Sequence, residues 1–570
     1  MTTAVSMMAA ADHLSSVMSP KTKAKAQAST LWIKNLVSYL SQPHHGLALL
    51  LLVFTPAICS RSTPELPRVY IDTSMPAQTA SISVAAGGDL QAAINNASCG
   101  TTILLASGAT FTGKFTLPNK NCIGWIIIRT NTADSNLPPL GARINPGYAS
   151  MLAKVVTNNA APVFQTDSGA HHYRLLGLNI GMMSGIGDVK TGLIVIGNHE
   201  FTLSDLPHDI TVDRCYIHGN PLDSLRRGIA ANGASVAVID SYISEVHEAG
   251  NGDTQAVWAS NSPGPLKIAD NYLEAAGENV MFGGADPAIA NLIPSDIEFR
   301  RNHLFKRIEW RGTWPVKNLF ELKNARRVLV EGNVMQYNWA PGHGLCIVLT
   351  PRNQNGRCPW CTVADVTFRY NIVRHVQGAF GIAGADTEAG TSQPAQRIYI
   401  HDNLMEDIND AIYGGMGRCY QVASGGITDP HDITIDHNDC FIEKGDAALF
   451  GGEPGHSVND FAFTNNISSY ANYGVAGTNV AASKVLNTYF PGSKFGGNVL
   501  VAPIAGRFSP SDCPLGNYFP REWRQVSFVN QAAGDFRLSD RSPYKKGGTD
   551  GEDIGINVAK LHAATAGVAF

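Results

Sequence analysis

The chain has 570 residues, of which 44% are hydrophobic and only 16% are charged, and its formal net charge at pH 7 is -4. This charge argues against a nucleic-acid-binding function, because there is also no basic run and no stripe of basic and aromatic residues. The 56 glycines exceed the usual share of about 7%. Few charges and many glycines favour an all-β protein with many tight turns.

Residues 1–59 have the features of a signal peptide that follows a long leader. The apolar run 46–54 is too short to span a bilayer but long enough for the core of a signal, and small residues follow it at 55–57. Cys59 raises a lipoprotein alternative, although Ile58 fits a lipobox poorly. We therefore expect a secreted or periplasmic protein with no stable membrane insertion.

Ten cysteines suit an exported protein with a few disulfides. Proximity in the sequence suggests that Cys99 pairs with Cys122 and that Cys419 pairs with Cys440. The CxxC motif at 358–361 has the spacing of a redox centre, but it lies between predicted strands and outside any βαβ unit. A local disulfide is the better prediction for it.

The first elements after the signal are short. Residues 60–84 are predicted to be a linker or edge strand, and residues 87–95 a short helix that Asp89 caps. Two strands are expected at 102–105 and 125–128. The helix would bury one apolar face, made of Leu90, Ala93, Ile94 and Ala97.

One short phrase, apolar-x-apolar-x-x-Asn, then recurs along most of the chain at spacings of about 30 residues, which is typical of a repeat architecture. Its first two copies are Ile210-x-Val212-x-x-Cys215 and Val236-x-Val238-x-x-Ser241. Looser copies begin at Ile126 and Tyr173. The later copies end in Asn271, Asn302, Asn333, Asn371, Asn403, Asn438 and Asn466.

Each copy predicts a strand with one buried face. About ten residues later comes a second apolar run that small residues end, as at 280–284, 412–415 and 449–452, so each repeat holds at least two β segments. Asparagines stacked at one position can hydrogen-bond along the stack and satisfy buried turn backbone. Leucine-rich repeats are shorter and propeller blades longer than this period, which leaves a parallel β-helix.

The chain resembles a known group, the right-handed parallel β-helix or pectin-lyase-like superfamily. Within this superfamily it resembles a secreted, bacterial-type member. The resemblance is carried by the opening at 87–117 (GGDLQAAIN…FTGKFTLP), by the repeats, and by the ending at 526–555 (VSFVNQAAGDFRLSDRSP…GEDIG). It implies an all-β, right-handed parallel β-helix over 85–555. We expect roughly ten or more coils, a short N-terminal capping helix and a tail at 556–570.

The resemblance singles out no enzyme family, since the superfamily includes pectate, alginate and chondroitin lyases as well as polygalacturonases. Equivalent side chains on successive coils would stack about 4.8 Å apart, which suits an extended sugar polymer. Charged residues concentrate between Glu245 and Asp386. Aligned by hand, Glu321 takes the slot that Phe282 holds one coil earlier, and Thr254, Glu278 and Lys317 share a column.

We predict a polysaccharide lyase that cleaves an acidic, uronate-containing polysaccharide by β-elimination. Such an enzyme needs a base, an acid and a means of neutralising the uronate carboxylate. The candidate catalytic residues are Lys317, Lys323 and Arg352. The candidate substrate-binding residues are His343, Asn353, Gln354 and Trp310. If Ca²⁺ neutralises the carboxylate, its candidate ligands are Glu278, Asp286 and Glu321.

Three alternatives stay open. A glycoside hydrolase would use two carboxylates on neighbouring or next-neighbouring coils, drawn from Glu248, Glu278 and Glu321. The second alternative is a β-helix that binds a glycan or a cell surface and catalyses no reaction. Glu321 and Lys323 could also form a purely structural salt bridge. In each case we expect a monomer whose partner is a polysaccharide.

Overall fold

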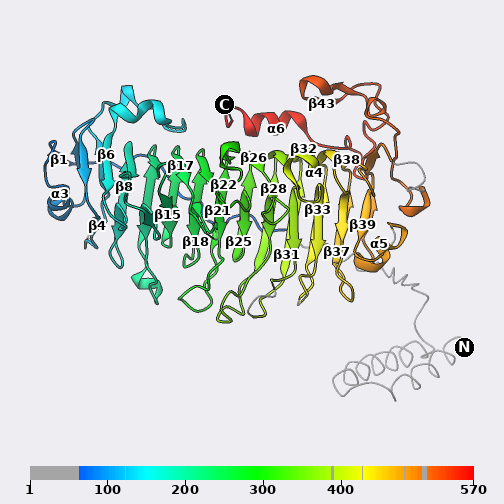
Figure 1. Ribbon diagram of the computed structural model, residues 1–570, viewed down its shortest axis with the longest axis horizontal. Coiled ribbons are helices and arrows are strands. Elements are labelled where there is room, and N and C mark those ends of the chain that lie inside the picture. The colour runs from blue at the N-terminus through cyan, green and yellow to red at the C-terminus, as the bar shows by residue number, and fades with distance from the viewer. Residues whose placement is uncertain are drawn as a thin grey trace, which may run out of the picture. The chain divides into compact units, whose positions relative to one another are not determined.

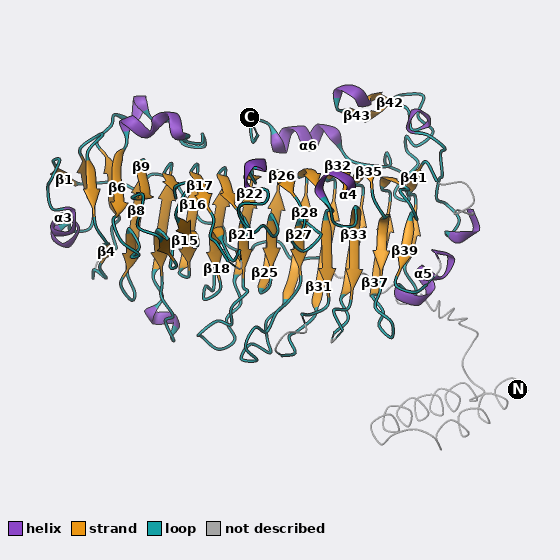
Figure 2. Ribbon diagram, viewed as in Figure 1, coloured by secondary structure: helices purple, strands orange, loops and turns teal. Residues whose placement is uncertain are grey.

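The computed structural model describes residues 63–121, 123–250, 252–386, 390–426, 428–480, 482–503 and 510–569. The predicted signal peptide, Cys59 and Cys122 lie outside these residues. Within them, the chain passes through three strand positions in a fixed order and repeats this order coil after coil (Figure 1, Figure 2). No helix in this part of the chain is long and apolar enough to cross a membrane.

The three strand positions build three parallel sheets. Sheet A contains β1 (Ala80–Val84), β2 (Thr101–Leu105), β5 (Ile126–Thr130), β8 (His171–Leu176), β12 (His208–Asp213), β16 (Ala234–Ile239), β19 (Leu266–Ala269), β22 (Ser295–Arg300), β25 (Ala325–Glu331), β28 (Val363–Arg369), β31 (Ala395–His401), β34 (His431–Asp436), β37 (Asn459–Thr464) and β40 (Lys494–Gly496).

Sheet B contains β3 (Thr110–Thr112), β6 (Ala153–Thr157), β9 (Leu178–Met182), β13 (Tyr216–His218), β17 (Tyr242–Val246), β20 (Tyr272–Ala275), β23 (His303–Phe305), β26 (Val334–Asn338), β29 (Ile372–Val376), β32 (Leu404–Asn409), β35 (Asp439–Lys444), β38 (Ile467–Ser469) and β41 (Val499–Val501).

Sheet C contains β4 (Phe115–Leu117), β7 (Phe164–Thr166), β11 (Ile194–Ile196), β15 (Arg227–Ala231), β18 (Gln255–Ala259), β21 (Val280–Phe282), β24 (Phe320–Leu322), β27 (Ile347–Leu349), β30 (Phe380–Ala383), β33 (Arg418–Ala423), β36 (Ala447–Gly451) and β39 (Val475–Gly477).

The remaining described elements are small. Two short strands, β10 (Asp188–Val189) and β14 (Ser224–Leu225), pair in parallel, and β42 (Phe528–Asn530) pairs antiparallel with β43 (Asp535–Leu538). The helices are α3 (Leu90–Asn96), α4 (Asp410–Tyr413), α5 (Ala482–Tyr489) and α6 (Val558–Thr565). Helix α3 is the predicted cap: Asp89 accepts from the Ala92 N–H at 2.9 Å, and its apolar face is buried.

These sheets make the protein a parallel β-helix, as the repeats predict, and a right-handed one, as the resemblance implies. The alternating apolar residues of the phrase pair in register from coil to coil, for example Leu266 with Ile297 and Ile297 with Val328. The looser copies also align, with Ile126 opposite Tyr173. Because every second residue of a strand points inward, these columns form one continuous apolar core.

The predicted asparagine stack is present at the turn between sheets A and B, and it is longer than predicted. Each asparagine Oδ1 accepts both the backbone N–H and the side-chain N–H of the asparagine one coil before, at 2.8–3.1 Å. The ladder continues past Asn466 to Asn498 and Asn517. It satisfies turn backbone that the solenoid buries.

Removing one rung should be costly. We expect Asn333→Ala to lower the free energy of unfolding by about 2–3 kcal/mol, because it removes four buried hydrogen bonds and leaves the Asn302 N–H without its acceptor. Denaturant unfolding measures this. The control is Asn472→Ala at an exposed position, where we expect less than about 0.5 kcal/mol. Equal effects of the two substitutions would contradict the role of the ladder.

Two predicted disulfides are confirmed, Cys358–Cys361 and Cys419–Cys440. Cys99 is disulfide-bonded. One predicted second strand is wrong: residues 412–413 belong to helix α4, and the sheet C strand of that coil is β33. Asn409 caps this helix by accepting from the N–H groups of Ala411 and Ile412, which turns the chain before it re-enters the sheet.

Chain segments cover two faces of the solenoid. Residues 65–79 run extended across sheet A and bond successively to Asp365, Asp296, Lys267 and Arg174. They lead into β1, which begins sheet A. The C-terminal segment with α6 lies along the turns between sheets A and B (Figure 1). The outer face of sheet C is where the predicted charged residues gather.

Candidate active site

Most of the predicted site residues lie on the outer face of sheet C, on and around strands β18, β21, β24 and β27. In the register of these strands the outward column runs through Trp258, Met281, Glu321 and Val348. The hand alignment of Glu321 with Phe282 is therefore wrong by one residue. Phe282 pairs with Leu322, because both are large apolar side chains that the core buries.

In the observed register Glu321 points to the outer face of sheet C and not into the core. Its side chain is only 2% exposed, and both of its carboxylate oxygens have a partner. Lys323 Nζ lies 3.0 Å from Oε1, and the Asn318 amide donates to Oε2 at 2.8 Å. Lys323 also contacts Asp386 at 3.4 Å, so this ammonium is held between two carboxylates.

Glu278 is the second buried carboxyl group of this face. Gln255 donates to its Oε2 at 2.7 Å, and Lys317 Nζ lies 3.2 Å from its Oε1. The predicted column of Thr254, Glu278 and Lys317 is also shifted by one residue, because the Thr254 hydroxyl accepts from the Gly277 N–H. Glu278 and Lys317 nevertheless meet as an ion pair, in which the Lys317 side chain is 28% exposed.

The two carboxyl groups have opposite pKa shifts. Burial and the neighbouring Glu321 raise the pKa of Glu278, against the effect of Lys317. Burial also opposes ionisation of Glu321, but Lys323, His343 and Lys317 outweigh it and lower the pKa of Glu321. Glu278 is therefore the carboxyl group that keeps its proton to higher pH, which is the usual arrangement of an acid beside an ionised partner.

Lys306 builds the turn that carries Glu278, a role for which the sequence offers no distinct signal. Its Nζ is completely buried and lies 2.6–2.9 Å from the carbonyl oxygens of Ala275, Ala276 and Gly277 and from Asn279 Oδ1. These four oxygens surround one amine, and burial lowers the pKa of Lys306 to about 7. The turn between β20 and β21 is thus held by hydrogen bonds from Lys306, a residue of the next coil.

Arg352 and His343 complete the site at its rim. Arg352 Nε lies 3.6 Å from Asp386, the carboxylate that also contacts Lys323. His343 is exposed on the loop before β27. Partial burial and the cations Lys323 and Lys317 lower the pKa of His343, against the effect of Glu321. The face therefore holds an imidazole that stays neutral to lower pH than usual.

Other predicted site residues are placed differently. Asn353 is buried and braces its own loop, since it donates to Thr391 O and accepts from the Cys358 N–H. Gln354 is half-buried beside it. Trp310 is 5% exposed and packs with Trp339 and other apolar side chains, so its ring offers no platform to a sugar.

The predicted Ca²⁺ ligands do not form a cluster. Asp286 accepts from the backbone N–H groups of Asn355 and Arg357 at 3.0 Å and so anchors a loop. Glu278 and Glu321 are each already paired with a lysine. Ca²⁺ requires six to eight oxygen ligands, and these three carboxylates do not fit it.

Three residues of this face, Arg227, Gln255 and Asn318, were not among the predicted site residues. Trp258 lies in the outward column, and the Arg227 guanidinium lies 4.0 Å from its ring centroid. Among the described residues, three buried polar atoms of this face lack a hydrogen-bond partner: Arg227 Nε, Gln255 Oε1 and Asn318 Oδ1. Unsatisfied buried groups are rare in proteins and are typical of functional sites. In the sequence these three polar residues stand close to apolar residues of a strand, and this alternation is the signal that could have identified them.

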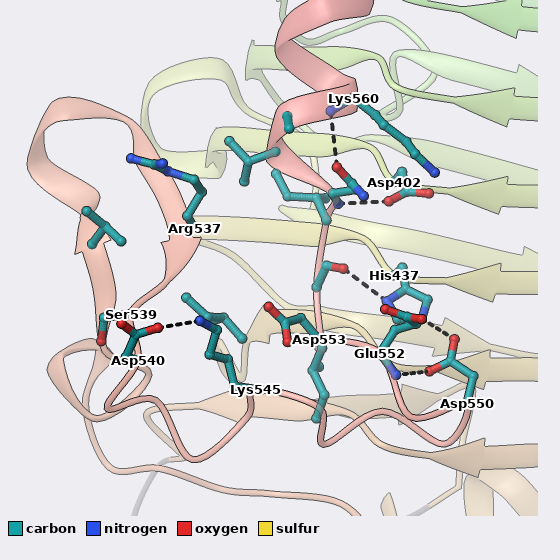
Figure 3. Close-up of a pocket in the computed structure, with 18 residues that line it drawn as sticks. Asp402, His437, Arg537, Ser539, Asp540, Lys545, Asp550, Glu552, Asp553 and Lys560 are labelled. Carbon is teal, nitrogen blue, oxygen red and sulfur yellow. Dashed lines mark hydrogen bonds and ion pairs between the residues drawn. The ribbon is translucent and has the colours of Figure 1, made fainter.

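A separate cavity of about 860 Å³ lies between the C-terminal segment and the turns that carry Asp402 and His437 (Figure 3). None of the predicted site residues lines it. Its polar side chains are largely paired with one another: His437 contacts Asp550 at 2.9 Å, and Asp402 accepts from the Asn557 N–H at 2.8 Å. These bonds hold the C-terminal segment against the coils.

This attachment should depend on pH. Burial opposes protonation of His437, but Asp436 and Asp550 outweigh it and raise its pKa above 6.5. The stabilisation from His437 is thus fully present below pH 6.5 and is lost as the pH rises through the raised pKa. We expect the amides of residues 550–557 to lose protection from hydrogen exchange over that range, after correction for intrinsic rates. In His437→Gln the protection should not change with pH, and pH-independent protection in the wild type would contradict the prediction.

No model of a known protein family matches the sequence, and no curated protein matches it. Among solved structures, a mannuronic-acid-specific family 6 polysaccharide lyase from human gut microbiota is 12% identical, with 76% of this chain and 89% of that chain covered and a TM-score of 0.42. A PL6 family alginate lyase is 13% identical, with 83% and 57% covered and a TM-score of 0.41.

The catalytic unit of a GH87 α-1,3-glucanase from Streptomyces thermodiastaticus strain HF3-3 is 13% identical, with 75% of this chain and 70% of that chain covered and a TM-score of 0.43. At such identities a likeness concerns the fold alone, and at such TM-scores it supports no functional assignment. The parallel β-helix follows from the strand pairing of this chain itself.

Proposed function

We propose that the outer face of sheet C binds an acidic, uronate-containing polysaccharide and cleaves it by β-elimination. One observation carries this proposal: Lys323, His343 and Lys317 surround the ionised Glu321, and Arg352 contacts Asp386, the carboxylate that also contacts Lys323. Lys317, Lys323 and Arg352 give this face three cationic side chains. Cationic side chains gathered on one face attract a polyanion.

The geometry of the face suits a polymer. The outward column runs across parallel strands at intervals of about 4.8 Å, so an extended sugar chain can contact several coils at once. Trp258 lies in this column, and the Arg227 guanidinium lies over the Trp258 ring. The unpartnered amide oxygens of Gln255 and Asn318 can accept hydrogen bonds from sugar hydroxyls if the side chains shift towards the ligand.

The reaction assigns a task to each side chain. His343, neutral at moderate pH, takes the proton from C5 of the uronate, and the electrons of that C–H bond form the C4–C5 double bond. Lys323 and Arg352 stabilise the negative charge that develops on the carboxylate. The C4–O bond breaks, and the Lys317 ammonium gives its proton to the departing oxygen. Assigning the base to His343 changes its sequence-based role from binding to proton transfer.

Lys323 is assigned no proton transfer in this scheme because Glu321 and Asp386 both contact its ammonium. No step is assigned to Ca²⁺, since the predicted ligands do not fit it. We therefore expect cleavage to persist in EDTA. A loss of cleavage in EDTA that Ca²⁺ restores would contradict the charge-neutralising role given to Lys323 and Arg352.

A second candidate is a glycoside hydrolase, and the opposed pKa shifts of Glu278 and Glu321 favour it. In that case Glu278 would be the acid and Glu321 the ionised partner. Glu248, the third carboxyl group considered, accepts from the Asp253 N–H and lies near the arginines of the preceding coil. Glu248 is therefore a neighbour of the pair Glu278 and Glu321 and not a member of it.

Incubation of the purified protein with a panel of uronate polymers and neutral glucans separates these functions. Lyase action produces a conjugated double bond that absorbs in the ultraviolet together with each new reducing end. Reducing ends without this absorbance indicate hydrolysis. Retention of the protein on an immobilised polymer without products indicates a binding protein. Either of these last two results would refute β-elimination on the polymers tested.

A further inference from the structure

A cluster of histidines lies on sheet A, on a different sheet from the candidate active site. Strand β8 begins with His171 and His172, and strand β12 begins with His208 and Asp209. The register pairs His208 with His171, so the two dipeptides lie on consecutive coils. The rings of His171 and His208 stack with their centroids 4.8 Å apart.

The polar atoms of this cluster converge. His172, His208 and Asp209 each offer a ligand atom, and these atoms all lie within 4.8 Å of one another. Among the described residues, this is the sole group of three or more histidine, cysteine or acidic side chains that meets this distance. His171 Nδ1 lies 2.7 Å from His172 Nδ1, and His208 Nδ1 lies 2.7 Å from Asp209 Oδ2.

The His-Asp contact has a local cause that must be separated from metal binding. The same tetrapeptide, His-Asp-Ile-Thr, recurs at 431–434, and His431 Nδ1 lies 2.8 Å from Asp432 Oδ2. In both copies the aspartate has a positive φ, 53° and 56°. The contact is thus a feature of this strand start. Only the first copy has histidines on the preceding coil, since His431 pairs with Gln396.

We propose that His172, His208 and Asp209 bind a late first-row divalent cation such as Zn²⁺, with His171 orienting His172. Two imidazoles and a carboxylate are a ligand set that suits Zn²⁺, while Mg²⁺ and Ca²⁺ prefer oxygen ligands alone. Binding displaces the proton shared by His208 and Asp209. The other ring N–H of a metal-bound imidazole donates to an outer partner, and His171 Nδ1, 2.7 Å from His172 Nδ1, is placed to accept this hydrogen bond.

The site is open to a cation from solvent. The His208 and Asp209 side chains are 41% and 35% exposed, so no unfolding is needed for entry. A bound ion would link two consecutive coils of the N-terminal half of sheet A. Since the ligands come together only in the folded chain, Zn²⁺ should stabilise the fold by mass action.

Calorimetric titration of the full chain with Zn²⁺, after removal of metal by EDTA and dialysis, tests the proposal. We expect one Zn²⁺ per chain at this site and a rise in the melting temperature with Zn²⁺. Loss of a ligand should weaken binding by more than the roughly 10- to 100-fold effect of an outer partner, so His172→Ala and His208→Ala should each bind at least about 100-fold more weakly. His431→Ala, the matched control, should bind like the wild type.

Several results would overturn the proposal: no binding of Zn²⁺ by the wild type, unchanged affinity in His172→Ala, equal loss in His431→Ala, or preference for Mg²⁺ over Zn²⁺. Because an alanine variant could fail to fold, His172→Asn is measured in parallel, and both are compared with the wild type by circular dichroism without metal. Polymer cleavage by His172→Ala should be unchanged, since the cluster lies on sheet A and the candidate active site on sheet C.

Discussion

The Lys317→Ala variant is expected to cleave the polymer about 10²- to 10⁴-fold more slowly than the wild type, the usual effect of removing a proton-transfer group. Lys317 is the more exposed of the two site lysines, and its ammonium is 3.2 Å from Glu278. The substitution removes the proposed acid and leaves the rest of the sheet C face intact. The loss should fall on kcat, with KM changed little.

The Lys154→Ala variant is the control for this experiment. Lys154 is an exposed lysine on strand β6 of sheet B, on another face of the same solenoid. It should retain wild-type activity and the wild-type unfolding midpoint, because Lys154 is exposed. Lys317→Ala leaves the buried Glu278 without its lysine and should lower the midpoint, so activity is compared at a temperature at which both variants are folded. If Lys317→Ala cleaves the polymer as fast as Lys154→Ala, the proton-transfer role of Lys317 is refuted.

The Lys306→Met variant is expected to lose about 3–5 kcal/mol of unfolding free energy, because several buried oxygens lose a donor at a cost of about 1–3 kcal/mol each. Methionine fills a similar volume but donates no hydrogen bond. Three carbonyl oxygens and Asn279 Oδ1 then lose the N–H groups of Lys306 that they share. Denaturant unfolding measures the loss, and cleavage should fall as well because the turn that carries Glu278 is released.

Lys267→Met is the matched control for this substitution. Lys267 is a half-buried lysine of strand β19 whose ammonium donates to Ile71 O at 3.3 Å and to Thr73 Oγ1 at 3.0 Å. We expect a loss below about 1 kcal/mol for it, because water can replace the lost partners at a half-exposed position. A loss in Lys306→Met no larger than in Lys267→Met would show that the four oxygens do not depend on the Lys306 amine.

The repeat phrase was enough to predict the fold. An apolar residue at every second position needs one buried face, and an asparagine at the same place in each copy needs a stack, so both signals are local and repeat from coil to coil. The structure confirms the stack from Asn271 to Asn466 and extends it to Asn517. The capping helix and two disulfides were predictable for the same reason, since each depends on residues close together in the chain.

The candidate site was predicted only in part. Lys317, Lys323, Glu278 and Glu321 are brought together on one face, because they come from neighbouring coils of a regular solenoid. Their pairing was predicted one residue out of register. A short strand such as 280–282 is apolar at all three positions, so its pattern does not tell which residues point inward.

The sequence by itself determined the coil, its period and the stretch of chain that carries the charge. Only the tertiary structure decided that Lys306 supports the turn of Glu278, that Asp286 anchors a loop, and that four histidine and aspartate side chains meet on sheet A. Those outcomes depend on strand register and on loops of variable length. Register is set by the fit of large side chains in the shared core, and a single-residue slip exchanges the buried and exposed faces of a strand.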